Sequence, residues 1–282
     1  MQPAPAGARQ SSTPQSENQS QQVVTLLLLV ATSASFALLW WRQTRTRNAT
    51  SVDAAWAIAI GGLGLACAVF GSGSPLQRIL AACIVGTWSA RLSWHLLAHR
   101  VLGHATEDGR YRAMREVWGA RANFWLFFFY QAQAGAAVVF TLPFWWLAAH
   151  EATALSPSQW CGLAVCVVSV AGESLADRQL ERHRRDPAQR GRTCRSGLWR
   201  YSRHPNYFFE WTTWCGIALI AAPAAGWLAL VQPAVMYVLV RYLSGVPFTE
   251  LQACKSRGED YRRYQQETSA FVPWWPRRID TP

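Results

Sequence analysis

The first candidates for chemistry are polar side chains that lie beside or inside apolar stretches, because an ionisable group is costly inside a membrane. Asn206 and Glu210 are four residues apart, directly after Pro205, and therefore share one helix face. Proline is tolerated in the first turn of a helix, and a helix N-terminus favours anions. Arg200 and Arg203 add positive charge there. This group predicts a site for a nucleotide-like ligand; the alternative is that Glu210 pairs with an arginine and holds the loop in place.

Two further pairs have helical spacing. Glu173 and Asp177 lie one turn apart, and either accept hydrogen bonds from a ribose or an amide, or pair with loop arginines. Arg91 and His95 have the same spacing inside an apolar run, which is typical of a buried polar pair that braces two helices. Asp53 opens another apolar run. It is a candidate proton donor, or it caps the helix that follows.

Known catalytic motifs are absent from the sequence. It has no GxGxxG after a strand, no HExxH, CxxC or His-rich cluster, and no GxSxG. We therefore predict no metal site, and any chemistry belongs to a bound organic cofactor that the protein orients. The seven cysteines form no CxxC pair, and most lie in apolar runs, so we interpret them as small buried residues. Tyr111, in a polar loop, is more simply explained as an interfacial anchor.

The elements that position these residues are apolar runs of the length a helix needs to cross a bilayer. We predict an all-α, polytopic membrane helical bundle with about seven transmembrane helices. Residues 1–22 are rich in Gln, Ser and Pro and are predicted to be a disordered N-terminal tail, whereas 23–282 form a single transmembrane domain. The predicted spans are 23–41, 52–70, 79–97, 124–146, 160–175, one that starts near Asn206 and one that ends near Leu243.

Positive charge alternates between the links that join these spans. The chain has 27 basic residues and a net charge of +11, and its Arg-rich links alternate with links that lack basic residues, apart from Arg78 at a helix end. By the positive-inside rule the N-terminus lies outside and the C-terminus in the cytoplasm. We expect the basic loops to contact membrane lipids and no nucleic acid, and we expect a bacterial inner membrane protein, or one of the endoplasmic reticulum in a eukaryote. Arginine also binds phosphate well, so a phosphate-bearing ligand stays open.

The stretch 196–210, SGLWRYSRHPNYFFE, resembles the signature of the DUF1295 family, which belongs with the membrane steroid 5α-reductase C-terminal superfamily. Further segments resemble the same family. Residues 48–56 match its (N/S)xxxVDxxW element, 107–112 its middle loop, and 173–177 the helix before the signature. Together with segments 257–261 and 268–274, the resemblance covers roughly 45–277.

The resemblance implies a seven-helix reductase that binds NADPH from the cytoplasm and reduces the double bond of an α,β-unsaturated carbonyl. Asp53 or Tyr111 would be the acid that hydrogen-bonds the carbonyl. The lipophilic substrate, a steroid, isoprenoid or fatty enone, would enter from the bilayer. The resemblance leaves open whether NADH can replace NADPH and which oligomeric state the protein adopts. The resemblance places these residues in the cofactor pocket: Glu173, Asp177, Arg184, Tyr201, Arg203, His204, Asn206, Tyr207 and Glu210.

Two other functions compete with this one. The signature RHPxY…E, which here contains His204 and Pro205, also occurs in membrane methyltransferases of the isoprenylcysteine carboxyl methyltransferase type. Those enzymes use S-adenosylmethionine. The VDxxW element and the Glu173/Asp177 pair favour the reductase. The third alternative is a non-catalytic membrane scaffold that binds lipid, in which the buried acids would only brace helices.

Overall fold

The computed structural model describes residues 14–102 and 106–277, and these residues form helices and no strand. The all-α fold predicted from the sequence is therefore confirmed. Short 3₁₀ and π turns join some of the helices. The helices are α1 (Pro14–Thr46), α2 (Ser51–Phe70), α3 (Pro75–Leu96), α4 (Gly109–Trp118), α5 (Ala122–Ala148), α6 (Pro157–Arg185), α7 (Pro205–Ala225), α8 (Val231–Val238), α9 (Val246–Arg257) and α10 (Glu259–Glu267).

Several of these helices are long and apolar enough to cross a membrane, as the sequence predicts. By length and composition, five candidate spans occur among the described residues: Leu26–Thr46, Ser51–Phe70, Gly109–Ala148, Pro157–Arg185 and Pro205–Arg257. The third and the fifth contain more than one helix, and α3, which carries Arg91 and His95, is not among them. The chain is thus a multi-pass membrane bundle, while the number of seven spans and the orientation stay predictions.

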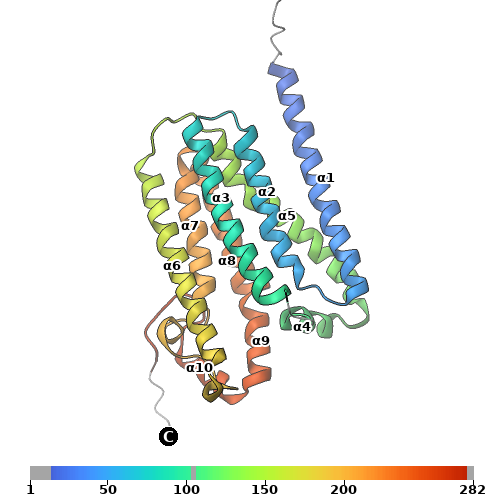
Figure 1. Cartoon of the computed structure of the whole chain (residues 1–282), viewed down its shortest axis with the longest axis vertical. Helices are drawn as coiled ribbons and strands as arrows, with labels where there is room; N and C mark the ends of the chain where they lie inside the picture. The colour runs from blue at the N-terminus through green and yellow to red at the C-terminus, as the bar shows by residue number, and fades with distance from the viewer. Residues whose placement is uncertain (1–13, 103–105, 278–282) are drawn as a thin grey trace, which may run out of the picture.

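Helix α1 lies at the edge of the bundle, beside α5 (Figure 1). It begins at Pro14, upstream of the predicted first span. The residues that follow Pro14 are polar but contain no helix breaker, and proline is compatible with a first helical turn. Residues 1–13 lie outside the described residues, so the disordered tail predicted for 1–22 stays a prediction.

Serine and proline set the starts of two helices that border the site. Pro75 and Pro157 stand in the first turns of α3 and α6, where a missing N–H costs no helical hydrogen bond. Ser74 and Ser156 cap these helices by accepting from backbone N–H groups of the first turn. Helix α7 also has a proline, Pro205, in its first turn, close to the predicted start at Asn206, but its N-cap His204 forms no side-chain cap.

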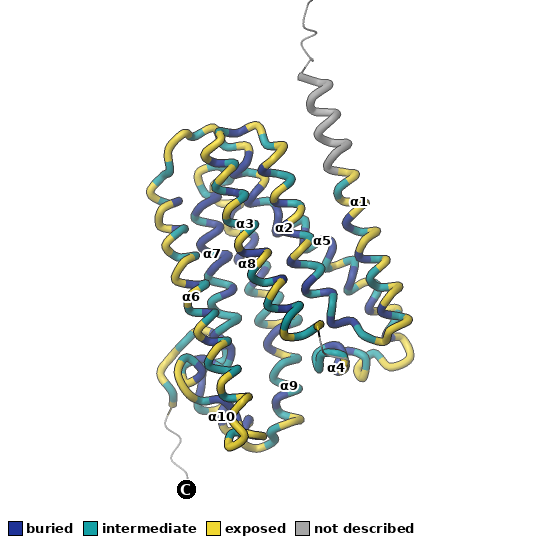
Figure 2. Tube along the Cα trace, viewed as in Figure 1, coloured by how far each residue is buried: buried dark blue, intermediate teal, exposed yellow. Residues whose placement is uncertain are grey.

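An aromatic cluster fills the centre of the bundle, between α2, α3, α5 and α7. The ring of Trp214 is fully buried and meets Trp88 at 5.1 Å and Phe140 at 4.5 Å between ring centroids, edge to face. Trp56 meets Phe140 at 5.3 Å in the same way. Such edge-to-face pairs add to the free energy gained by burying the rings. Buried residues lie mainly on the inward faces of these helices, whereas the part of α1 from Leu26 onward is mostly exposed (Figure 2).

The two ends of the bundle differ. At one end α3 and α6 are held together by Gln77 and Gln159, whose Nε2 donates to Gln77 Oε1 at 2.7 Å. Close to this glutamine pair, α6 and α7 pack so tightly that a Cβ on Gly162 would lie 2.5 Å from the carbonyl oxygen of Gly216. Toward the other end α3 and α6 diverge, and α4, α9 and α10 lie there (Figure 1). This divergence leaves room for the candidate site.

Candidate functional site

A cavity of about 770 Å³ lies between the diverging ends of α3 and α6, bordered by α7, α9 and α10; we name it the outer cavity. Its volume is in the range of about 300–1,000 Å³ found for small-molecule sites. Its polar wall is dominated by guanidinium groups. The arginines that line it are Arg91, Arg100, Arg110, Arg178, Arg184, Arg203 and Arg257.

Some of these arginines are not neutralised by a carboxylate. Among the described residues, Arg184 and Arg257 form no ion pair or hydrogen bond, although Arg257 lies over the ring of Tyr261 at 5.2 Å. Arg178 donates only to a carbonyl of its own helix, at 3.1 Å. The buried hydroxyl of Thr193, another wall residue, has no partner either. Such open donors suit an anionic ligand that carries phosphate.

A smaller cavity of about 180 Å³, here named the inner chamber, adjoins the outer cavity. Much of its wall is apolar, with Trp56 from α2, Leu92 from α3, and Met236 and Leu239 from the region of α8. The same side chains line parts of both cavities, so two ligands bound there would meet at this boundary. These shared residues are His95, Arg100, Arg110, Asp177, Asn206 and Tyr207.

A buried ionic network separates the inner chamber from the aromatic core. Glu210 accepts hydrogen bonds from the indole N–H of Trp88 at 3.0 Å and of Trp214 at 3.1 Å. Arg91 donates to Glu210 at 3.3 Å and to Glu173 at 2.6 Å. Both carboxylates line the inner chamber and not the outer cavity. The arginine pairing considered for Glu210 is therefore present, and its partner comes from α3.

Three helices meet at the boundary between the cavities. Asn206, in the first turn of α7, donates to Asp177 of α6 at 3.2 Å. His95 of α3 approaches the other oxygen of Asp177, with 3.8 Å between His95 Nε2 and Asp177 Oδ2. The sequence pairs Asn206/Glu210, Glu173/Asp177 and Arg91/His95 thus come together in one cluster.

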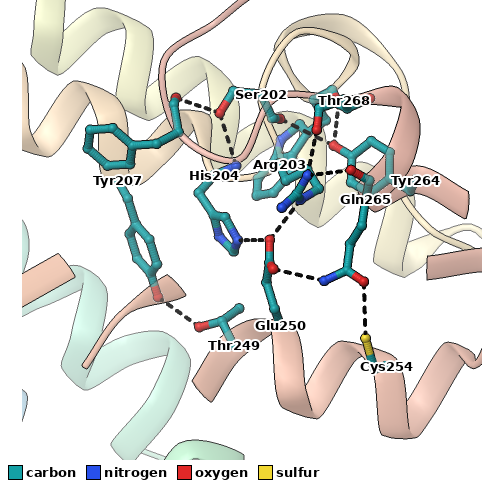
Figure 3. Close-up of polar contacts among 12 residues, drawn as sticks. Ser202, Arg203, His204, Tyr207, Thr249, Glu250, Cys254, Tyr264, Gln265 and Thr268 are labelled. Atoms are coloured by element: carbon teal, nitrogen blue, oxygen red, sulfur yellow. Dashed lines mark hydrogen bonds and ion pairs between the residues drawn. The ribbon is translucent and has the colours of Figure 1, made fainter. Parts of the chain in front are cut away.

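The residues before α7 bind the loop to α9 and α10 (Figure 3). Arg203 donates to Glu250 at 2.7 Å and to the carbonyls of Gln265 and Thr268 at 2.8 and 2.5 Å. Arg203 lines the outer cavity, but its guanidinium is already engaged by these three groups. It therefore positions the cavity wall.

His204 continues this contact. Its Nε2 lies 3.3 Å from Glu250, and its ring stacks on Tyr207 with 5.4 Å between the centroids. Burial lowers the pKa of His204 although Glu250 raises it, and the nearby Arg203 lowers it further. The hydroxyl of Tyr207 lies 3.3 Å from that of Thr249, and either can be the donor.

The candidate acid residues Asp53 and Tyr111 are hydrogen-bonded to each other. The phenol of Tyr111 donates to Asp53 Oδ1 at 2.6 Å, and Arg110 donates to Asp53 Oδ2 at 2.6 Å. Asp53 lines the inner chamber, whereas Tyr111 is 1% exposed and lines neither cavity. Beside them, burial raises the pKa of Asp108, but the charges of Arg110 and Arg100 outweigh it and hold that pKa below its usual value.

Some positions differ from the predicted pocket. The side chain of Tyr201 lines neither cavity; its ring meets Trp275 edge to face at 5.5 Å. Arg184 lines the outer cavity. Arg257 and Arg100 could not be singled out from the sequence, because an arginine in a basic segment looks like any other positive-inside charge. Gln133, an amide within an apolar run that lines the inner chamber, was not among the predicted site residues either.

The bundle of apolar helices with an arginine-lined cavity defines a multi-pass membrane protein. Over residues 39–268 the chain matches the model of the DUF1295 family, described as a protein of unknown function, and the protein belongs to that family. An uncharacterized protein of Schizosaccharomyces pombe is similar to it, with 26% identity over 84% of this chain and 76% of the yeast protein. No solved structure matches.

Proposed function

We propose that the protein is an NADPH-dependent membrane oxidoreductase that reduces a carbon–carbon double bond conjugated to a carbonyl in a lipophilic substrate. The observation that carries this proposal is the pair of adjoining cavities. The outer cavity is large and rich in arginine, whereas the inner chamber is small and has an apolar wall, which includes Leu92, Met236 and Leu239, beside its ionised groups. A reductase of this kind needs a polar site for its hydride donor directly beside an apolar site for its acceptor.

The outer cavity suits NADPH by its donors. Arg184 and Arg257 have no carboxylate partner and would hold phosphate groups, including the phosphate that distinguishes NADPH from NADH. The unpaired hydroxyl of Thr193 would donate to a phosphate or ribose oxygen. Asn206 and Asp177, at the boundary with the inner chamber, offer an amide and a carboxylate for the end of the cofactor that faces the substrate.

When bound, NADPH supplies a hydride to the β-carbon of the double bond. The α-carbon takes a proton from water that enters through the outer cavity, so the double bond gains one hydride and one proton. Asp53 lines the chamber and is held by Tyr111 and Arg110. The apolar wall formed by Leu92 and Met236 limits the access of other water.

We also propose a topology for this function. Seven spans, with the N-terminus outside and the C-terminus in the cytoplasm, put the outer cavity on the cytoplasmic side, where NADPH is available. The substrate enters the inner chamber from the bilayer. In a bacterium the protein lies in the inner membrane, and in a eukaryote in the endoplasmic reticulum.

The charge of the outer cavity also weighs against the main alternative. S-adenosylmethionine carries a sulfonium cation, which a wall of arginines would repel, whereas a dinucleotide carries several negative charges.

Ligand-induced thermal stabilisation of the detergent-purified protein tests the proposal. We expect NADPH to raise the unfolding midpoint in a dose-dependent way, since a ligand at 100 times its dissociation constant stabilises by about 2.7 kcal/mol. NADH should be weaker and S-adenosylmethionine without effect. Stabilisation by S-adenosylmethionine alone would support the methyltransferase, and no response to any of the three would support the scaffold.

A further inference from the structure

Gln133 is a polar side chain in the wall of the inner chamber that has no hydrogen-bond partner among the described residues. It lies on α5, half-buried, and lines the chamber together with Trp56 and Met236. Within the described part of the chain its amide forms no hydrogen bond. Its neighbour Gln131 differs, because it accepts from Ser33 Oγ at 2.6 Å and donates to the Ser33 carbonyl at 3.4 Å.

The unpaired amide is unusual for its surroundings. Gln77 and Gln159, which are fully buried, pair with each other, whereas the half-buried Gln133 does not form such a pair. An amide in an apolar environment without a partner is unfavourable for folding, and polar groups at membrane depth commonly mark a functional site. Gln133 therefore has an open NH₂ and an open carbonyl toward the chamber, with no structural contact to account for it.

Most other polar groups of the chamber are engaged by the protein, whereas the indole N–H of Trp56 also has no partner among the described residues. Asp53 accepts from Tyr111 and Arg110, and Glu210 accepts from two indoles and Arg91. The hydroxyl of Ser244 donates to the carbonyl of Leu239 at 3.0 Å. Gln133 is therefore an amide that a chamber ligand can use without breaking an existing hydrogen bond, and among the described chamber residues that lack a partner it offers both a donor and an acceptor, whereas Trp56 offers a donor alone.

We infer that the inner chamber binds the oxygen-bearing head of the substrate and that the Gln133 amide donates the hydrogen bond that recognises this oxygen. This inference rests on the proposed function. The chamber volume of about 180 Å³ sets the size of the head. An apolar cavity of about 150 Å³ holds one benzene ring. The substrate class is thus a lipophilic enone whose carbonyl end is a single ring or a short branched chain.

The test compares 3-methylcyclohex-2-en-1-one with 1-methylcyclohexene, which has the same ring without the oxygen. Binding of each is measured from the shift of the thermal midpoint with concentration, on the full-length protein in detergent without NADPH. The wild type should prefer the enone by about tenfold, the size expected when a hydrogen bond is made in a closed site. Gln133→Leu should lose this preference and keep or raise the midpoint of the free protein, because no protein contact is lost.

Gln131→Leu is the matched control on the same helix. It removes the contacts to Ser33, so it should lower the thermal midpoint and keep the preference for the enone. The inference is overturned if Gln133→Leu keeps the preference, if it lowers the midpoint as much as Gln131→Leu does, or if the wild type shows no preference. Stabilisation by NADPH is recorded separately on the wild type, so a failure of the proposed function is distinguishable from a failure of this inference.

Discussion

Arg91 of α3 and Glu173 of α6 form an ion pair, with 2.6 Å between Arg91 Nη2 and Glu173 Oε2; Arg91 lines the outer cavity and Glu173 the inner chamber. The same guanidinium reaches Glu210 of α7 at 3.3 Å. One cation therefore links three helices and stands between two carboxylates that would otherwise repel each other. The geometry of the inner chamber depends on this contact.

Removal of the cation should destabilise the bundle. Breaking a buried ion pair from one side costs about 3–5 kcal/mol. We expect Arg91→Gln to fall toward the lower end of that range, because the Arg91 side chain is 23% exposed. The measurement is the thermal midpoint in detergent. Arg185→Gln is the control, since Arg185 pairs with Glu181 on the surface and is 76% exposed. An equal decrease of the thermal midpoint in both variants would contradict the claim that the Arg91 network stabilises the bundle.

The free arginines of the outer cavity should control cofactor affinity. Arg184→Gln combined with Arg257→Gln should raise the dissociation constant for NADPH by about tenfold or more, because each removes a charge-assisted contact to phosphate. The thermal midpoint of the free protein should stay the same, since neither side chain forms an ion pair.

Arg182→Gln, on the same helix but outside the cavity wall, is the control and should leave NADPH binding unchanged. The ratio of NADPH to NADH affinity is the second measurement. An unchanged ratio in the double variant would argue against a role of these arginines at the additional phosphate.

Much of this architecture could be predicted from the sequence, and the reasons differ by residue. Apolar runs and prolines mark helices, so α2 and α6 appear close to their predicted places. Helical spacing placed Glu173 beside Asp177 correctly on one face. Partners from distant segments could not be predicted, because no local pattern shows that Trp88 and Arg91 bind Glu210. The proximity of Asp53 to Tyr111 likewise depends on how α4 packs against the start of α2.

The stability of the folded protein should decrease as the pH is lowered through the range where histidine titrates. The pKa of buried His204 is lowered in the folded protein, whereas in the unfolded chain it is about 6.5. Below that pH the unfolded state binds more protons than the folded state, so the free energy of unfolding decreases as the pH falls. We expect the thermal midpoint of the wild type to drop between about pH 6.5 and pH 5, and His204→Gln to show a flatter profile. Parallel profiles would show that His204 does not contribute.

Tyr111 should position Asp53 and not act as the acid itself, because it lines neither cavity. Loss of a general acid lowers the rate by about 10²–10⁴-fold, whereas a hydrogen bond to a charged group, as between Tyr111 and Asp53, contributes about 1.5–3 kcal/mol of stability. Tyr111→Phe should therefore reduce NADPH-dependent turnover less than tenfold and lower the thermal midpoint. A loss of 10²-fold or more with an unchanged midpoint would restore Tyr111 as the acid.

The size of the inner chamber should select among enones. With NADPH, the wild type should reduce a single-ring enone with a kcat/KM about tenfold or more above that of a four-ring steroid enone, because the chamber of about 180 Å³ holds about one ring. Leu239→Ala enlarges the half-buried wall and should narrow the difference, whereas Val238→Ala, on the exposed side of the same turn, should not. Equal rates on both substrates in the wild type would show that the chamber widens on binding, because a rigid wall leaves the fused rings no space beside the cofactor.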